Sequence, residues 1–209
     1  MFLRNVFICL LIAVVACQPK EQQSDDAPMD EDALQEKVLQ MGDSIANSSQ
    51  QTLAQNLQKA IQLGGVAEAI RFCNLAAMPL TDSLSRKYNV QIRRASLRVR
   101  NPKDAPTEEE RPILEAYQQK LARNQPLSAQ VHELDDAHLL YTQPIVISNA
   151  LCLNCHGEVG AAVTEETHAL ILEKYPDDNA TGHKMGELRG MWSITFNKFS
   201  YLLKKDEML

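Results

Sequence analysis

The segment Cys152-Leu153-Asn154-Cys155-His156 constrains this chain more than any other feature. Two thiols two residues apart, followed directly by a histidine, have the spacing of a covalent haem site, in which both sulfurs add to the vinyl groups of one porphyrin and the imidazole binds the iron. A thioredoxin-like dithiol would need a βαβ context, which the sequence does not show. A structural zinc site would need four ligands, and the sequence has no second Cys-x-x-Cys pair. The motif therefore predicts one covalent haem c per chain, held by Cys152, Cys155 and His156.

The first residues predict export. Arg4 precedes an apolar run at residues 6–16, which has the length of a signal-peptide core and is too short to span a bilayer. The run ends Val14-Val15-Ala16-Cys17, which resembles a bacterial lipobox, in which the cysteine is acylated and becomes the new N-terminus. We therefore expect residues 1–16 to be a signal peptide and Cys17 to be the site of lipid attachment. The alternative is an ordinary cleaved signal peptide without a lipid.

A lipid on Cys17 would hold the protein on the periplasmic face of a membrane through the anchor alone. Gln18, rather than aspartate, follows the cysteine and favours the outer membrane. Residues 17–32 are polar, acidic and free of aromatic residues, so they are expected to be a lipidated N-terminus and disordered linker ahead of one domain at residues 33–209. The net charge of -6 argues against nucleic-acid binding, which needs clustered Lys and Arg.

Hydrophobic periodicity predicts helices at the start of this domain. Apolar residues recur at three- and four-residue steps over residues 33–61, and Gly64-Gly65 ends that helix. A second helix follows, with Cys73 on its apolar stripe and Pro79 kinking or resetting it. Later, Thr107 and Glu110 have the spacing of a capping box at the start of another helix.

The remaining pattern mixes strands and short helices. Alternating residues predict a strand over residues 89–100, on which Arg94, Arg98 and Arg100 share one face. Because arginine binds carboxylates with a planar fork, these three are candidates to hold the haem propionates; the alternative is a solvated face paired with acidic residues. Further strands are expected at 129–134, 138–147 and 191–196, and helices at the Cys-x-x-Cys-His motif and at 165–175. This order predicts an α+β domain.

Several segments together resemble a known family, the exported bacterial c-type haem domains with a PAS-like fold, which occur alone or fused to signalling proteins and have long been catalogued as domains of unknown function. The matching segments are Ala69 to Asn74, Arg93 to Pro102, Cys152 to Gly157 and Gly182 to Ile194. The resemblance implies N-terminal helices packed on a PAS-like antiparallel sheet. It also implies a haem iron held by histidine and a cysteine thiolate, which on this chain are His156 and Cys73. Ala95 stands where the family often has threonine.

Chemistry supports Cys73 as an iron ligand without settling the assignment. Export leaves Cys73 without a thiol partner if Cys152 and Cys155 hold haem, and free thiols tend to be oxidised outside the cytoplasm. Ligation would protect the sulfur, and a metal ion lowers a thiol pKa. A buried structural cysteine is the alternative. Rival distal ligands are Met185, His183 and Met78, since methionine is common in electron-carrying cytochromes.

Axial ligation by His156 and Cys73 would leave no vacant position on the iron, so we expect no enzyme activity. Loss of the thiolate on reduction or protonation would open the iron to a diatomic gas. The first hypothesis is therefore a redox or gas sensor module, whose partner is an unidentified redox or signalling protein, since no kinase, cyclase or receiver segment is recognisable. The alternative is a low-potential electron-transfer cytochrome c, and a third is a haem enzyme with an open sixth position.

Overall fold

The structure is a computed structural model that describes residues 31–202. The predicted signal peptide, Cys17 and nearly all of the predicted linker lie outside the described residues. The first helix begins at Glu31, two residues before the expected start of the domain. Across residues 31–202, no helix combines the length and the apolar character needed to cross a membrane.

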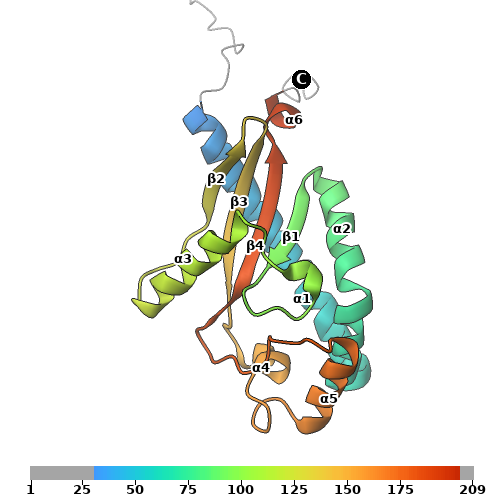
Figure 1. The fold of residues 1–209 in the computed structure, drawn as a ribbon. Coiled ribbons are helices and arrows are strands. Elements are labelled where there is room, and N and C mark those ends of the chain that lie inside the picture. Colours follow the sequence, from blue (N-terminus) through green and yellow to red (C-terminus); the bar gives the residue numbers. More distant parts are fainter. Residues whose placement is uncertain (1–30, 203–209) are drawn as a thin grey trace, which may run out of the picture.

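A four-stranded antiparallel sheet forms the centre of the fold, in the order β1-β4-β3-β2 (Figure 1). Its strands are β1 (Gln91–Ala95), β2 (Gln130–Asp135), β3 (His138–Val146) and β4 (Leu188–Asn197). In the central register, Ile194 of β4 lies opposite Ile92 of β1 on one side and Tyr141 of β3 on the other. The strand predictions at 129–134, 138–147 and 191–196 are confirmed to within a few residues, and so is the α+β fold class.

Helices cover both faces of this sheet (Figure 1). The long helix α1 (Glu31–Leu75) runs behind the sheet, and α2 (Ala77–Tyr88) lies beside it against β1. Gly42 of α1 packs directly on the ring of Tyr141, where a Cβ atom would lie 2.2 Å from Tyr141 Cδ2. Helix α3 (Glu110–Ala122) covers the other face.

Side chains of β4 point alternately to the two faces of the sheet and contribute to a hydrophobic core on each face. Trp192, Ile194 and Phe196 point toward α1 and α2, where they join one buried apolar cluster. Met191 points the other way and packs with Leu114 and Tyr117 of α3, among others. Because strand side chains alternate with period two, a single buried strand serves both layers.

Two glycines divide α1 as the sequence predicts. Gly64 and Gly65 have non-helical backbone angles, and Gly65 has a φ of 66°, a conformation that favours glycine. The helix therefore changes direction here, and its last part carries Cys73. Pro79 lies in the first turn of α2, which is where a helix tolerates proline.

The capping box before α3 is also confirmed. Thr107 Oγ1 accepts a hydrogen bond from Glu110 N at 3.2 Å, and Thr107 N donates to Glu110 Oε2 at 2.9 Å. Glu110 is buried, and its carboxylate also accepts from Ser193 Oγ at 2.6 Å and Arg93 Nη1 at 2.5 Å. The box thus ties α3 to β1 and β4.

The predicted strand at residues 89–100 is wrong in its second half, because β1 ends at Ala95. Ser96 N donates to Asp104 O at 3.0 Å instead of pairing with β4, and the Ser96 hydroxyl lies 2.9 Å from Arg98 O. The chain then turns into a short 3₁₀ helix, η1 (Pro102–Asp104). As a result Arg94, Arg98 and Arg100 do not share one strand face.

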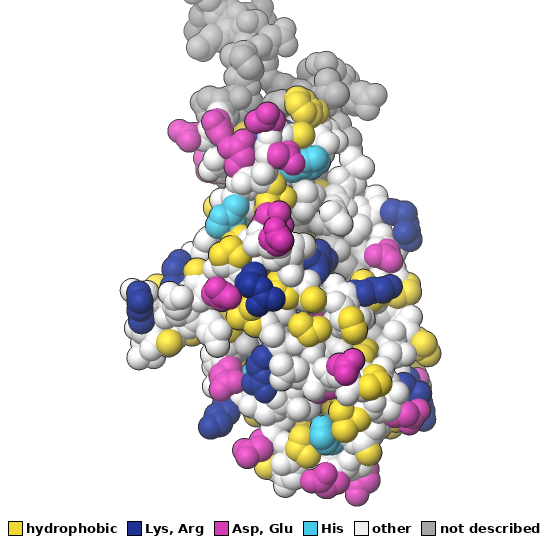
Figure 2. All heavy atoms as spheres, viewed as in Figure 1, with side chains coloured by type: hydrophobic (Ala, Val, Ile, Leu, Met, Phe, Trp, Pro, Cys, Tyr) yellow, Lys and Arg dark blue, Asp and Glu magenta, His cyan; other side chains and the backbone are white. Residues whose placement is uncertain are grey.

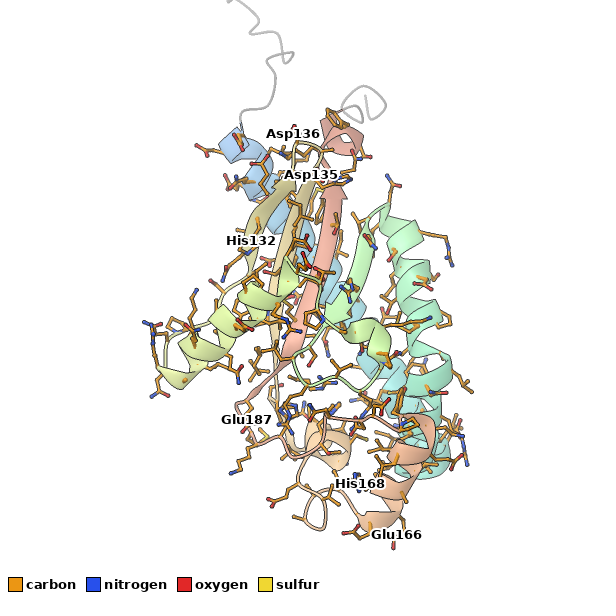
Figure 3. The ribbon with its side chains drawn as sticks, viewed as in Figure 1. His132, Asp135, Asp136, Glu166, His168 and Glu187 are labelled. Atoms are coloured by element: carbon orange, nitrogen blue, oxygen red, sulfur yellow. The ribbon has the colours of Figure 1, made fainter. Side chains whose placement is uncertain are left out.

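The segments around the Cys-x-x-Cys-His motif lie at the end of the sheet away from the described termini (Figure 1). Helix α4 (Ala150–His156) follows β3, α5 (Glu165–Lys174) comes next, and α6 (Lys198–Leu202) ends the described chain. Acidic side chains gather at the opposite end, over the β2–β3 turn that contains Asp135 and Asp136 (Figures 2 and 3). Further acidic side chains, including Glu166 of α5, lie at the motif end (Figures 2 and 3).

Candidate haem-binding site

The residues of the Cys-x-x-Cys-His motif lie on one short helix. Asn149 caps α4, since its Oδ1 accepts from Cys152 N at 3.3 Å, and Gly157 follows the last turn with its N–H bonded to Leu153 O at 2.8 Å. Residues three and four positions apart lie on the same side of a helix. Cys152, Cys155 and His156 therefore face one region, as the spacing predicts.

That region is a cavity whose empty space of about 810 Å³ includes some space open to solvent. Its wall is formed by residues of α1, the end of β1 and the segment after it, α4, the end of α5 and the start of β4. Cys73 of α1 lies in this wall together with the three motif residues. The apolar part of the wall is formed by Leu57, Ile61, Val66, Ala69, Ile70 and Leu151.

His156 has a defined tautomer. Its Nδ1 lies 2.9 Å from the backbone carbonyl oxygen of Ala180. A carbonyl only accepts hydrogen bonds, so Nδ1 carries the proton and Nε2 keeps its lone pair. Burial, together with Arg189 and Arg100, holds the pKa of His156 well below its usual value, so the ring is neutral. A neutral imidazole whose second nitrogen donates to a carbonyl is the usual state of a metal-binding histidine.

The cysteines in the cavity wall form no disulfide among the described residues. Burial raises the pKa of Cys73, while Arg94, Arg100 and Arg189 act in the opposite direction. Burial raises the pKa of Cys155 to about 11. The protein alone therefore favours protonated thiols at both positions.

Arginines give the cavity an excess of positive charge. Arg94, Arg100 and Arg189 line it, whereas Asp104 is the one carboxylate among the described lining residues. Burial raises the pKa of Asp104, while Arg94 and Arg189 act in the opposite direction. Within residues 31–202, neither Arg94 nor Arg189 forms an ion pair with a carboxylate. The cavity thus combines an apolar wall with positive charge, which suits an apolar group that carries carboxylates.

The other two arginines proposed from the sequence are used within the protein. Arg98 does not line the cavity; its guanidinium donates to backbone carbonyls of the loop after α5, including Asn179 O at 3.2 Å and Thr181 O. Arg100 lines the cavity but forms an ion pair with Asp178, at 2.7 Å from Nε to Oδ1. The structure therefore leaves Arg94 as the predicted arginine best placed for a propionate.

Comparison with known proteins identifies the family of this chain. The family model described as Tll0287-like matches residues 22–197. The chain belongs to the Tll0287-like family. A similar solved structure, described as that of the cyanobacterial heme-protein Tll0287, is 26% identical, with 70% of this chain and 91% of that chain covered and a TM-score of 0.48. The search of curated proteins found no match.

In this member of the Tll0287-like family, the rival distal ligands lie outside the cavity wall. His183 is buried, and its Nδ1 lies 3.2 Å from Glu187 Oε2. Glu187 is the residue before β4 and lies at the end of the sheet near α4 (Figure 3). Its ring contacts that of His156 edge-on, with centroids 6.3 Å apart. Met185 is half exposed, and neither it nor Met78 lines the cavity.

Sequence reasoning missed several residues of this site. Arg189 lies inside the segment that carries the family resemblance, yet nothing in its pattern marks it as a cavity residue. Asp178 lies in a stretch that reads as an ordinary loop, although its side chain is fully buried. Tyr175, at the end of α5, completes the wall near Cys73.

Proposed function

We propose that this chain binds one haem covalently through Cys152 and Cys155, with His156 as an iron ligand. The observation that carries this proposal is that His156 Nδ1 is bonded to the Ala180 carbonyl while the ring and both thiols lie in the wall of one cavity. Membership of a family that includes a protein described as a heme-protein supports it. Arg94 and Arg189 supply positive charge for the two propionates.

Cys73 is the proposed second iron ligand. It enters the cavity wall from α1, whereas His156 enters from α4, so the two ligands come from different elements. A bound haem would supply one-electron redox chemistry at the iron. Burial raises the pKa of the Cys73 thiol, and the guanidiniums of Arg94, Arg100 and Arg189 only partly offset this, so the iron itself would have to stabilise the thiolate.

With both axial positions filled by protein, the site favours sensing over catalysis. We propose a redox or diatomic-gas sensor module, in which Cys73 leaves the iron on reduction. The protein would be an exported lipoprotein anchored at Cys17, on the periplasmic face of a membrane, and would pass its state to a redox or signalling partner. A low-potential electron-transfer cytochrome is the second candidate, favoured by the partly buried position of His156 and its hydrogen bond to Ala180 O.

Absorption spectra of the holoprotein in the ferric and ferrous states, with and without carbon monoxide, separate these functions. A thiolate spectrum that is lost on reduction, followed by carbon monoxide binding, supports the sensor. A six-coordinate spectrum that persists in both states supports electron transfer. A high-spin ferric resting state would contradict both and indicate an open position.

The Cys73→Ala variant tests the ligand assignment, with Met185→Ala as the matched control. Cys73→Ala is expected to abolish the ferric thiolate spectrum and leave haem attachment intact, because Cys152 and Cys155 are untouched. Met185→Ala is expected to keep the wild-type spectrum, because Met185 lies outside the cavity wall. The opposite result, with only Met185→Ala changing the spectrum, would contradict the assignment.

A further inference from the structure

A buried ion pair lies directly behind the motif helix. Arg100 Nε and Nη2 lie 2.7 Å and 3.2 Å from the two carboxylate oxygens of Asp178, so the contact is bidentate. The exposed fractions of the two side chains are only 11% and 0%. The two side chains of such a pair hold each other in place, because separating them leaves an uncompensated buried charge.

Each member of the pair also holds a backbone group next to His156. Arg100 Nη2 donates to Cys155 O at 2.7 Å, which fixes the end of α4. Asp178 Oδ1 accepts from Ala180 N at 3.3 Å, which fixes the residue whose carbonyl receives His156 Nδ1. The pair therefore supports the imidazole from two directions, through the helix that carries it and through its hydrogen-bond acceptor.

We propose that Arg100 and Asp178 form a positioning pair for His156, which sets the orientation and basicity of the imidazole and thereby the reduction potential of the site. The inference rests on the proposed function. Carbonyl and carboxylate groups behind a ligating histidine raise its basicity and fix its ring plane. In this role Arg100 Nε and Nη2 act within the protein, on Asp178 and on Cys155 O, rather than on a propionate.

The sign of the effect follows from charge. Asp178→Asn removes one negative charge and leaves the positive charge of Arg100 uncompensated near the site. Added positive charge near the iron favours the ferrous state. Looser support of Ala180 N also weakens the carbonyl acceptor of His156, making the imidazole a poorer donor to ferric iron. Both effects raise the reduction potential of the variant.

The test is the midpoint potential of the Asp178→Asn holoprotein by spectroelectrochemistry. We expect a shift toward the ferrous form of roughly tenfold in the equilibrium constant, about 59 mV for a one-electron couple. The matched control is Arg93→Lys, which alters another partly buried arginine–carboxylate pair, Arg93–Glu110, whose members do not line the cavity. An Asp178→Asn shift no larger than that of Arg93→Lys would overturn the proposal.

A second variant decides the matter if Asp178→Asn yields no soluble protein. Arg100→Lys keeps the charge but not the planar fork that reaches Asp178 and Cys155 O together. We expect its ferric electron paramagnetic resonance spectrum to shift and broaden, because the imidazole plane is less fixed, and a spectrum identical to wild type would overturn the proposal. Haem staining of the wild-type protein on a denaturing gel separates this failure from failure of the proposed function.

Discussion

Arg94 of β1 and Arg189 of β4 enter the same cavity from neighbouring strands, and within residues 31–202 neither is paired with a carboxylate. Arg189 is partly buried, and desolvation together with Arg100 and Arg94 lowers its pKa to about 10. Its Nη1 donates to Ser96 Oγ at 2.7 Å and Arg98 O at 3.0 Å, both of which are neutral acceptors. Two cations held this way favour an anionic ligand in the cavity.

Replacement of Arg94 tests this electrostatic role. The Arg94→Gln holoprotein should have a lower reduction potential than wild type, because the loss of a nearby positive charge favours the ferric state. The expected shift is several-fold in the equilibrium constant, opposite in sign to that of Asp178→Asn. Arg123→Gln, at the exposed end of α3, is the control and should leave the potential unchanged. Equal shifts in both variants would show that the effect is not local.

The buried carboxylate of Glu110 is expected to stabilise the sheet. It accepts from Arg93, Ser193 and the Thr107 backbone, so Glu110→Gln leaves part of this network unpaired. We expect the free energy of unfolding in urea to fall by about 3 kcal/mol, the lower end of the cost of breaking a buried pair. Glu108→Gln, at an exposed position, should change it by less than about 0.5 kcal/mol. Similar losses for both variants would refute a special role for Glu110.

His132 of β2 (Figure 3) should make stability depend on pH. Burial lowers the pKa of His132, and its Nε2 is buried without a hydrogen-bond partner among the described residues. Below its usual pKa of about 6.5, the unfolded chain takes up a proton that the folded chain resists, so stability falls as pH decreases from 7.5 to 5.

The measurement is the urea midpoint as a function of pH for wild type and His132→Asn. The variant should lose less stability than wild type over this range, because it lacks the group that protonates only on unfolding. At pH 8, where histidine is neutral in both states, any difference between the two proteins reflects packing alone. Parallel profiles down to pH 5 would rule out a contribution from His132.

Local patterns were sufficient to predict much of this fold. The Cys-x-x-Cys-His spacing places its three side chains on one side of a helix, and the apolar stripe of the second predicted helix carries Cys73 inward. Thr107 and Glu110 mark a helix start through two hydrogen bonds between near neighbours. These features depend on residues a few positions apart, which is why the sequence reveals them.

Contacts between distant segments were not predictable in the same way. The strand predicted through Arg100 stops at Ala95 because Ser96 pairs with Asp104 and with backbone atoms near Arg189, 93 residues away. The roles of Arg98 and Arg100 likewise depend on the loop after α5, which approaches them only in the folded chain. Alternation alone does not distinguish a continuing strand from a turn with such partners.

Covalent attachment at Cys152 and Cys155 is the claim on which the rest depends, and it is tested most directly on the mature protein from cells that mature c-type cytochromes. After denaturing electrophoresis, haem stain should stay with the wild-type polypeptide and be absent from the Cys152→Ala/Cys155→Ala double variant, while Cys73→Ala should still stain. A wild-type band without stain, or a double variant that stains equally, would contradict the account.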